Sequence, residues 1–275
     1  MKGRISIRWV STLVLLIPAI LHLFPILYII SISLKSPAEV FAFPPSLIPD
    51  APGLANYSKA FEVAPLGRFL VNSMIVSLAV TLLQLLTSIW AAFALARLEF
   101  LGKNIILGLV VATMMVPAEV TIIPNYMTII GFGWLDHYIA MIAPFSASGF
   151  GVFLLYQFFK SIPKELEEAV IVDGASRFRF LWQFVVPLSM PAIVAFGVYS
   201  FISTWNQYLW PLIVTQSTDM RTVQVGISMF RSENESSSWG IIMAATTILI
   251  VPSIAIFVAT QKQFVRGITM SGIKG

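Results

Sequence analysis

Acidic side chains that could bind a partner are concentrated in one stretch, ELEEAVIVDGASRFRFLWQFVVP, at positions 165–187. Pro163 suits the first turn of a helix, and the glutamates after it would lie near the positive N-terminal end of that helix. Gly174 tolerates the positive φ of a sharp helix end, and Ser176 can cap a second helix. The stretch therefore predicts two short helices at a bend. It is either a docking surface for a cytoplasmic partner or an amphipathic connection lying on the membrane surface.

Each of the two predicted helices also has an apolar side. In the first helix Leu166, Ala169 and Val170 are spaced by three and four residues. In the second helix the i, i+3, i+4, i+7 pattern is formed by Phe178, Leu181, Trp182 and Val185. Both helices are therefore expected to pack their apolar face against other apolar surface and to leave their polar face exposed.

One carboxylate lies inside an apolar run. Glu119 stands in VPAEVTIIP, between Pro117 and Pro124. An acidic side chain such as Asp costs about 2.5–3.5 kcal/mol at the bilayer centre on insertion scales, so Glu119 is expected to face a cavity or gate. The alternative is a carboxylate near the outer interface, neutralised by protonation or by a residue of a partner subunit.

A second polar group lies in a later apolar run and consists of Trp205, Asn206, Gln207 and Tyr208. Amide and hydroxyl groups can hydrogen-bond the hydroxyls of a solute, and aromatic rings offer flat faces to a sugar or polyol. The alternative is that Asn206 and Gln207 hold membrane helices together, as buried amides often do.

The sequence lacks the residues that metal binding, nucleophilic catalysis and nucleotide binding usually require. There is no Cys, and the only histidines, His22 and His137, are far apart, so no metal-ligand spacing is present. Neither a G-x-S-x-G nucleophile motif nor a G-x-x-x-x-G-K-[ST] nucleotide-binding loop occurs. We therefore expect no cofactor in this chain and no ATPase site of its own.

The composition is that of an integral membrane protein. Of the 275 residues 57% are hydrophobic and 11% charged, whereas about a quarter are charged in a soluble domain. Six apolar runs, near 9–34, 69–95, 104–124, 139–160, 188–215 and 239–261, approach or exceed the roughly 20 residues of a membrane-spanning helix. We expect an all-α protein, one domain over residues 1–275, with six transmembrane helices and a cytoplasmic loop at 161–187.

The distribution of Lys and Arg predicts the orientation. Six crossings put both termini on one side of the membrane, and 12 of the 17 Lys and Arg fall on that side, against five on the other. The twelve are Lys2, Arg4, Arg8, Arg97, Lys103, Lys160, Lys164, Arg177, Arg179, Lys262, Arg266 and Lys274. The positive-inside rule therefore places both termini in the cytoplasm. It also accounts for the net charge of +4 without a nucleic-acid partner.

The 165–187 stretch resembles a known motif. Glu168-Ala169-Val170 is followed after three residues by Gly174, and after nine more by FVVP ending at Pro187. This spacing is similar to the EAA loop of permease subunits in bacterial ATP-binding-cassette (ABC) importers. FPPSLIPDAPGLANY, NSMIVSLAV, AAFALARLEFLGK and FVRGITMSGIKG resemble the carbohydrate-uptake group of these permeases. Within that group, MMVPAEVTIIP, DGASRFRF and WNQYLWPLIV are most similar to permeases for sn-glycerol-3-phosphate.

The resemblance implies a type I importer permease fold in a bacterial cytoplasmic membrane. It implies a second permease subunit, two ATPase subunits that bind ATP and Mg²⁺, and an extracytoplasmic solute-binding protein. The residues carried over for ATPase coupling are Glu168, Ala169, Asp173, Gly174 and Pro187. The implied solute is sn-glycerol-3-phosphate or a glycerophosphodiester, with a di- or oligosaccharide as the alternative. A more remote alternative is an ion-coupled carrier working alone, although only Glu119 stands out as an intramembrane carboxylate.

Overall fold

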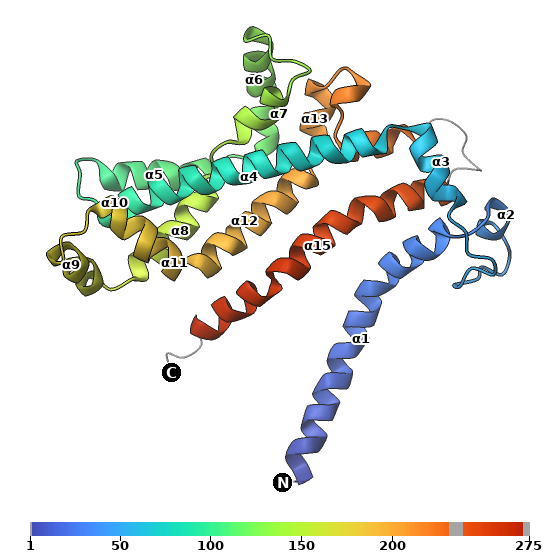
Figure 1. Ribbon diagram of the computed structural model, residues 1–275, viewed down its shortest axis with the longest axis horizontal. Coiled ribbons are helices and arrows are strands. Elements are labelled where there is room, and N and C mark those ends of the chain that lie inside the picture. Colours follow the sequence, from blue (N-terminus) through green and yellow to red (C-terminus); the bar gives the residue numbers. More distant parts are fainter. Residues whose placement is uncertain (1, 231–238, 272–275) are drawn as a thin grey trace. The chain divides into compact units, whose positions relative to one another are not determined.

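The computed structural model describes residues 2–230 and 239–271, and every regular element in these ranges is a helix (Figure 1). Arg231 and Lys274, which entered the charge count, lie outside the described residues. The chain forms two compact units, one of residues 1–68 and 226–251, the other of residues 69–225 and 252–275. The expectation of a single domain stays a prediction.

The first unit contains α1 (Lys2–Ser33), α2 (Pro37–Val40), α3 (Ala55–Val63) and the beginning of α15 (Trp239–Ser271). Buried Asn56 of α3 donates through Nδ2 to the carbonyl oxygens of Ser33 (2.9 Å) and Lys35 (2.8 Å), and so fixes α3 to the end of α1. The Pro-rich residues after α1 form only the single turn α2, as their composition predicts.

The second unit is built around the long helix α4 (Leu66–Arg97), which begins at the end of the first unit. The other elements are α5 (Lys103–Thr113), α6 (Ala118–Gly131), α7 (Tyr138–Ile142), the 3₁₀ turn η1 (Ala143–Phe145), α8 (Gly149–Ser161), α9 (Lys164–Val172), α10 (Arg177–Phe180), the π-helical turn η2 (Leu181–Val185), α11 (Val186–Leu188), α12 (Met190–Trp205), α13 (Leu209–Val214) and the 3₁₀ turn η3 (Thr218–Met220). Helix α14 (Val223–Met229) begins in this unit and passes into the first unit at Gly226. Helix α8 contacts both α5 and α12 (Figure 1).

Two apolar cores lie along α4. Near its C-terminal end, Ile89, Ala92 and Phe93 pack with buried residues of α8, α9, α10, η2 and α12. Near its N-terminal end, Val76 and Val80 pack with α6, α7 and α13. The second unit is therefore held together by one helix that contributes to both cores.

Only three of the six expected spans are continuous helices, Val14–Ser33, Leu66–Arg97 and Trp239–Gln261. The other candidates are bent pairs, at 98° between α5 and α6, 44° between Tyr138–Phe145 and α8, and 78° between Arg177–Leu188 and α12. The apolar run at 104–124 is therefore broken between Thr113 and Ala118, next to one of the two prolines that stand in it. Pro117 precedes α6, and because proline has no backbone N–H and restricts the residue before it, a helix usually ends there.

The break before α8 frees backbone carbonyls, and α4 supplies their partners. Gln84 donates through Nε2 to the Phe145 carbonyl oxygen (2.8 Å), and Thr87 donates through Oγ1 to that of Ser146 (3.2 Å). An irregular backbone at membrane depth is tolerated where neighbouring helices satisfy its polar groups in this way.

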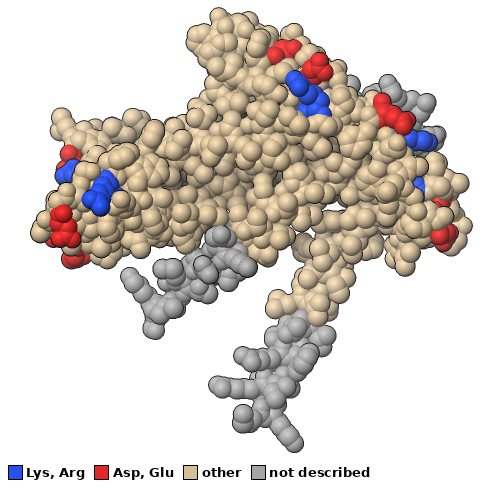
Figure 2. All heavy atoms as spheres, in the orientation of Figure 1, with Lys and Arg blue, Asp and Glu red and all other residues tan. Residues whose placement is uncertain are grey.

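Charged side chains are sparse on the surface. On the face shown in Figure 2, Lys, Arg, Asp and Glu gather in a few small groups, with broad uncharged surface between them. Large apolar side chains are exposed along the candidate spans, among them Leu21 at 66%, Leu82 at 59% and Val251 at 58%. This surface fits a chain whose solvent is lipid.

Candidate functional site

Helix α9 ends as the sequence predicts. Gly174 has φ +82°, its N–H donates to the Ile171 carbonyl (2.9 Å), and the Ala175 N–H donates to that of Val170 (3.1 Å). This pair of bonds is a Schellman motif, which satisfies carbonyls left free at a helix end. Ser176 then caps α10, because its Oγ accepts from the Arg179 N–H at 3.2 Å. The predicted bend between two short helices is therefore confirmed.

The segment from α9 to α11 is packed on one side and open on the other. The buried side chains Val170, Phe180, Leu181 and Val185 enter the core formed with α4, α8 and α12. The exposed side presents the five residues expected to couple to the ATPase, namely Glu168, Ala169, Asp173, Gly174 and Pro187. We call residues 161–187 the coupling segment.

The expected apolar face of the second short helix is only partly formed. Leu181 and Val185 are buried as predicted, but Phe178 is 66% exposed and lies against Trp182 with ring centroids 6.2 Å apart. The prediction assumed a regular α-helical period. The backbone instead widens to a π-helical turn from Leu181 to Val185, which changes which side chains share a face.

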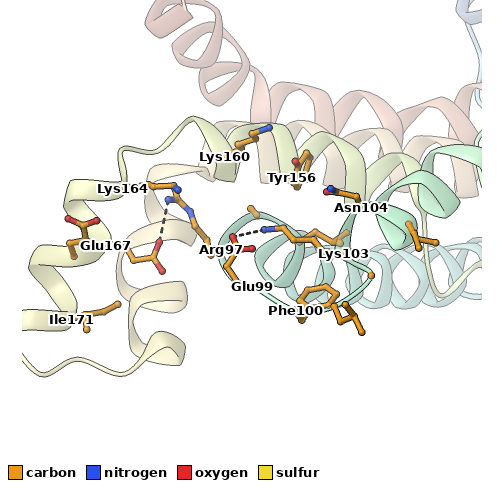
Figure 3. Close-up of a pocket in the computed structure, with 16 residues that line it drawn as sticks. Arg97, Glu99, Phe100, Lys103, Asn104, Tyr156, Lys160, Lys164, Glu167 and Ile171 are labelled. Carbon is orange, nitrogen blue, oxygen red and sulfur yellow. Dashed lines mark hydrogen bonds and ion pairs between the residues drawn. The ribbon is translucent and has the colours of Figure 1, made fainter.

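A charged cavity of about 750 Å³ lies beside the coupling segment (Figure 3). It is lined by the end of α4, the link to α5, the end of α8 and one side of α9, including Glu168. At its wall Arg97 Nη1 lies 3.4 Å from Glu167 Oε2, and its Nη2 donates to the carbonyl oxygens of Phe159 (2.5 Å) and Ile162 (2.6 Å). Sequence analysis counted Arg97 among the cytoplasmic charges and assigned it no role in a site. The one feature of its position that could have singled it out is that it stands at the end of an apolar run.

Glu119 lies in the first turn of α6, directly after the 98° bend. It is exposed, with Pro117 at the N-cap position and Pro124 inside the helix. The structure describes no hydrogen bond or ion pair between Glu119 and residues 205–208. The placement of both groups in one solute pathway stays a prediction.

Residues 205–208 form the break between α12 and α13. Trp205 is only 1% exposed and stacks on Phe201 at 5.7 Å, so its ring belongs to the interior of the unit. Asn206 is exposed, and its Oδ1 accepts from Gln224 Nε2 at 3.2 Å. Gln207 is partly exposed, and Tyr208 is 42% exposed.

The structure adds two residues to the Asn206 face that the sequence did not single out. Tyr199 and Ser203 are exposed on α12 and stand seven and three residues before Asn206, which puts all three on one side of the helix. The Tyr199 ring lies 5.1 Å from the ring of Phe150. An accessibility pattern of this kind cannot be read from hydropathy, because Tyr and Ser also occur in packed helices.

The segment after α13 is fixed near the N-terminal end of α4. Asn72 is fully buried, donates through Nδ2 to the carbonyls of Asp219 (2.7 Å) and Arg221 (2.9 Å), and accepts from the Tyr138 hydroxyl (2.6 Å). Asp136 Oδ1 accepts from the backbone N–H groups of Gln216 (2.9 Å) and Ser217 (3.0 Å). Partial burial acts to raise the pKa of Asp136, but these bonds and nearby His137 prevail and lower it.

No cluster of three or more His, Cys, Asp or Glu that could hold a metal ion occurs among the described residues. What the structure offers is a set of broken and continuous apolar helices with short polar helices packed at the end of α4. This arrangement defines a multi-pass membrane protein.

The family profile described as "Binding-protein-dependent transport system inner membrane component" matches residues 84–270. The sulfoquinovosyl glycerol transport system permease protein SmoH of Agrobacterium fabrum is 35% identical over 98% of this chain and 94% of its own. The sn-glycerol-3-phosphate transport system permease protein UgpE of Yersinia enterocolitica is 35% identical over 94% of each chain. The chain therefore belongs to the family of binding-protein-dependent inner-membrane transport components, the permease subunits of ABC importers.

The fold agrees with this membership. A chain in the crystal structure of a bacterial ABC transporter involved in alginate import superposes with a TM-score of 0.84 at 24% identity, covering 96% of this chain and 98% of that chain. The resemblance stated from the sequence is thus confirmed, as are the all-α class and the permease fold. The cytoplasmic placement of both termini stays a prediction.

Proposed function

We propose that this chain forms half of the membrane pathway of an importer for a glycerol-containing solute, with sn-glycerol-3-phosphate first and a glycerophosphodiester next. The observation that carries the proposal is the similarity to permeases over nearly the whole chain. These relatives, at 35% identity, are named for sn-glycerol-3-phosphate or for sulfoquinovosyl glycerol. Glycerol is the unit that the two solutes share.

The proposed assembly sits in a bacterial inner membrane with both termini in the cytoplasm. A second permease chain completes the pathway, two ATPase subunits bind ATP and Mg²⁺, and an external binding protein delivers the solute. Family membership argues against the alternative of an ion-coupled carrier working alone. This chain itself has the role of a transport subunit, not of an enzyme.

The coupling segment is the proposed contact with the ATPase. Its exposed Glu168, Asp173 and Gly174 are available to a partner, while Val170 and Phe180 are buried against the long helices. Because packed interiors transmit displacement instead of absorbing it, closure of the ATPase subunits would move α9 and the spans together. Binding of ATP and its hydrolysis by the ATPase subunits then change which side of the membrane has access to the solute.

The proposed solute-facing surface is the polar side of α12, formed by Tyr199, Ser203 and Asn206, with Tyr208 next to it. Exposed polar side chains on a membrane helix are costly in lipid, so they face a pathway or a partner chain. Hydroxyl and amide groups beside an aromatic ring suit the hydroxyls and the carbon chain of a polyol. Trp205 and Gln207 would support this surface from behind.

Glu119 is proposed to act at a gate and not as a ligand of the solute. An ionised carboxylate would repel a phosphate, and the position of Glu119 in the first turn of α6 follows the 98° bend, the sharpest of the three bent helix pairs. Helix bends lined by polar groups are places where membrane transport proteins open and close.

The test is the ATPase activity of the complete complex in lipid, stimulated by its binding protein loaded with one solute at a time. The solutes are sn-glycerol-3-phosphate, glycerophosphocholine, sulfoquinovosyl glycerol, maltose and trehalose. Stimulation by glycerol-containing solutes alone supports the proposal. Stimulation by maltose or trehalose alone would replace the solute by an oligosaccharide, the alternative favoured by the sugar unit in the name of the SmoH relative. No stimulation by any of them would reject both solutes.

A further inference from the structure

Arg97 connects three helices of the second unit, namely α4, α8 and α9. They meet at the end of this unit where the coupling segment lies. It is the last residue of α4, and its side chain is only 3% exposed. One guanidinium nitrogen faces Glu167 of α9, and another donates to the carbonyls of Phe159 and Ile162 at the end of α8. Figure 3 shows the arginine reaching across the cavity wall to α9.

The geometry is favourable for a cation. The last carbonyls of a helix lack intrahelical partners and form the negative end of its dipole, so a positive side chain there is stabilising. The planar guanidinium offers five donors in a fixed fork, which allows one side chain to serve the α8 carbonyls and a carboxylate at the same time. Glu167 is itself only 14% exposed, so the pair is shielded from solvent.

We propose that Arg97 is a positioning residue for energy coupling, through which a displacement of α9 reaches α4 and α8 together. The inference rests on the proposed role of the coupling segment. Apolar packing alone would let α9 slide along its neighbours, since it is non-directional. The directed bonds of Arg97 fix α9 relative to the ends of both long helices.

The experiment uses the complete complex in proteoliposomes and measures solute transported per ATP hydrolysed, together with the amount of ATPase subunit retained. The variants are Arg97→Gln, Arg97→Lys and Glu167→Gln. The matched control is Lys103→Gln. Lys103 lines the same cavity but bonds Glu99 and the Leu98 carbonyl within its own link.

Arg97→Gln is expected to retain the ATPase subunits, because the exposed face of α9 is unchanged, and to lower transport per ATP at least about fivefold, the small end of typical coupling energies. Arg97→Lys should fall between Arg97→Gln and the unchanged protein, since a single ammonium cannot reproduce the fork. Glu167→Gln should lower the amount of solute transported per ATP, while Arg97 still bonds the end of α8. If the Arg97→Gln complex does not assemble, the result for Glu167→Gln tests the inference. Lys103→Gln should keep the original ratio.

A ratio that is unchanged in Arg97→Gln or Glu167→Gln, or that also falls in Lys103→Gln, would overturn the inference. A purely structural role would lower the amount of complex without changing transport per ATP, and would overturn it too. Failure of the proposed function would appear differently. The unsubstituted complex would then show no ATP-dependent transport, and the inference would fall with it.

Discussion

Glu168 is the exposed carboxylate on which the docking interpretation depends most. Glu168→Lys reverses the charge that α9 presents to its partner, and like charges facing each other across an interface are strongly unfavourable. We expect uptake to fall by at least about tenfold, equivalent to about 1.4 kcal/mol of docking free energy. The measurement is solute uptake at equal amounts of membrane-inserted protein.

The control for this change is Glu62→Lys, which reverses an exposed carboxylate on α3, outside the coupling segment. It should transport normally. Normal uptake by Glu168→Lys would contradict the coupling role. So would a loss of uptake explained entirely by a smaller amount of protein in the membrane.

Asn206 distinguishes a solute contact from a contact between helices. Asn206→Leu keeps the branched shape of the side chain but removes the amide, and loss of one hydrogen bond to solute, worth about 0.5–1.5 kcal/mol, should weaken apparent affinity roughly two- to tenfold. The measurement is concentration-dependent uptake. Gln224→Leu, which removes only the protein partner of Asn206, is the control. If both variants merely reduce the amount of folded protein, the amide holds helices together instead.

At the level of elements, the bend after α9 was predictable and the face of α10 was not. The Asp173-Gly174 pair and Ser176 mark local backbone geometry, which depends on neighbouring residues and can be read from sequence. Phe178 was misplaced because a π-helical turn has no local signature comparable to glycine or proline. Arg97 was not recognised because its partners are 62–70 residues away in the chain.

Gly174 allows a graded test of the bend. Gly174→Ala has free space for its Cβ but must adopt φ +82°, which costs roughly 1–2 kcal/mol, and should reduce uptake only moderately. Gly174→Pro cannot adopt this φ and also loses the N–H that donates to the Ile171 carbonyl. We expect it to abolish transport while membrane insertion, measured by immunoblotting, continues. Normal uptake by Gly174→Pro would show that the bend geometry does not matter.

The Asp136 contacts predict a pH dependence of stability. Because the folded-state pKa of Asp136 is lowered, ionised Asp136 stabilises the fold at pH values above its ordinary value of 3.8, and this contribution is lost as the pH falls through the lower folded-state pKa. Asp136→Asn should therefore lower the melting temperature at neutral pH by a few degrees at most. The difference between the two proteins should shrink below about pH 4. A difference that stays constant with pH would contradict the prediction.

For the whole molecule, hydropathy located the apolar segments but not their directions. The composition of residues 104–131 and 177–205 makes both segments apolar enough to enter a membrane. Mean hydropathy is a sum over residues, however, so it does not predict the angle between two helices. The 98° bend between α5 and α6 has a cause that is visible in the sequence, namely Pro117. The end of α12 at Trp205 is not marked by a proline at that position. At this second break Asn206 is bonded by Gln224, which stands 18 residues later and is brought close only in the folded chain.

The whole chain is expected to be inactive without its partners. Reconstituted alone, it should neither hydrolyse ATP nor take up solute, because the nucleotide-binding loop is missing from its sequence and the proposed pathway is only half formed. Affinity purification after expression with its neighbouring genes should recover an ATPase subunit. ATP-independent uptake by the chain alone would reject the assembly proposed above.

Helix α4 has bonded partners at three heights along its 32 residues, or about 48 Å. Asn72 holds the segment after α13, Gln84 and Thr87 hold the broken backbone before α8, and Arg97 holds the end of α8 together with α9. A straight helix is much stiffer along its axis than the loops it holds. If α4 moves as one body during the proposed import cycle, the segments bonded to it at these three heights move with it at the same time.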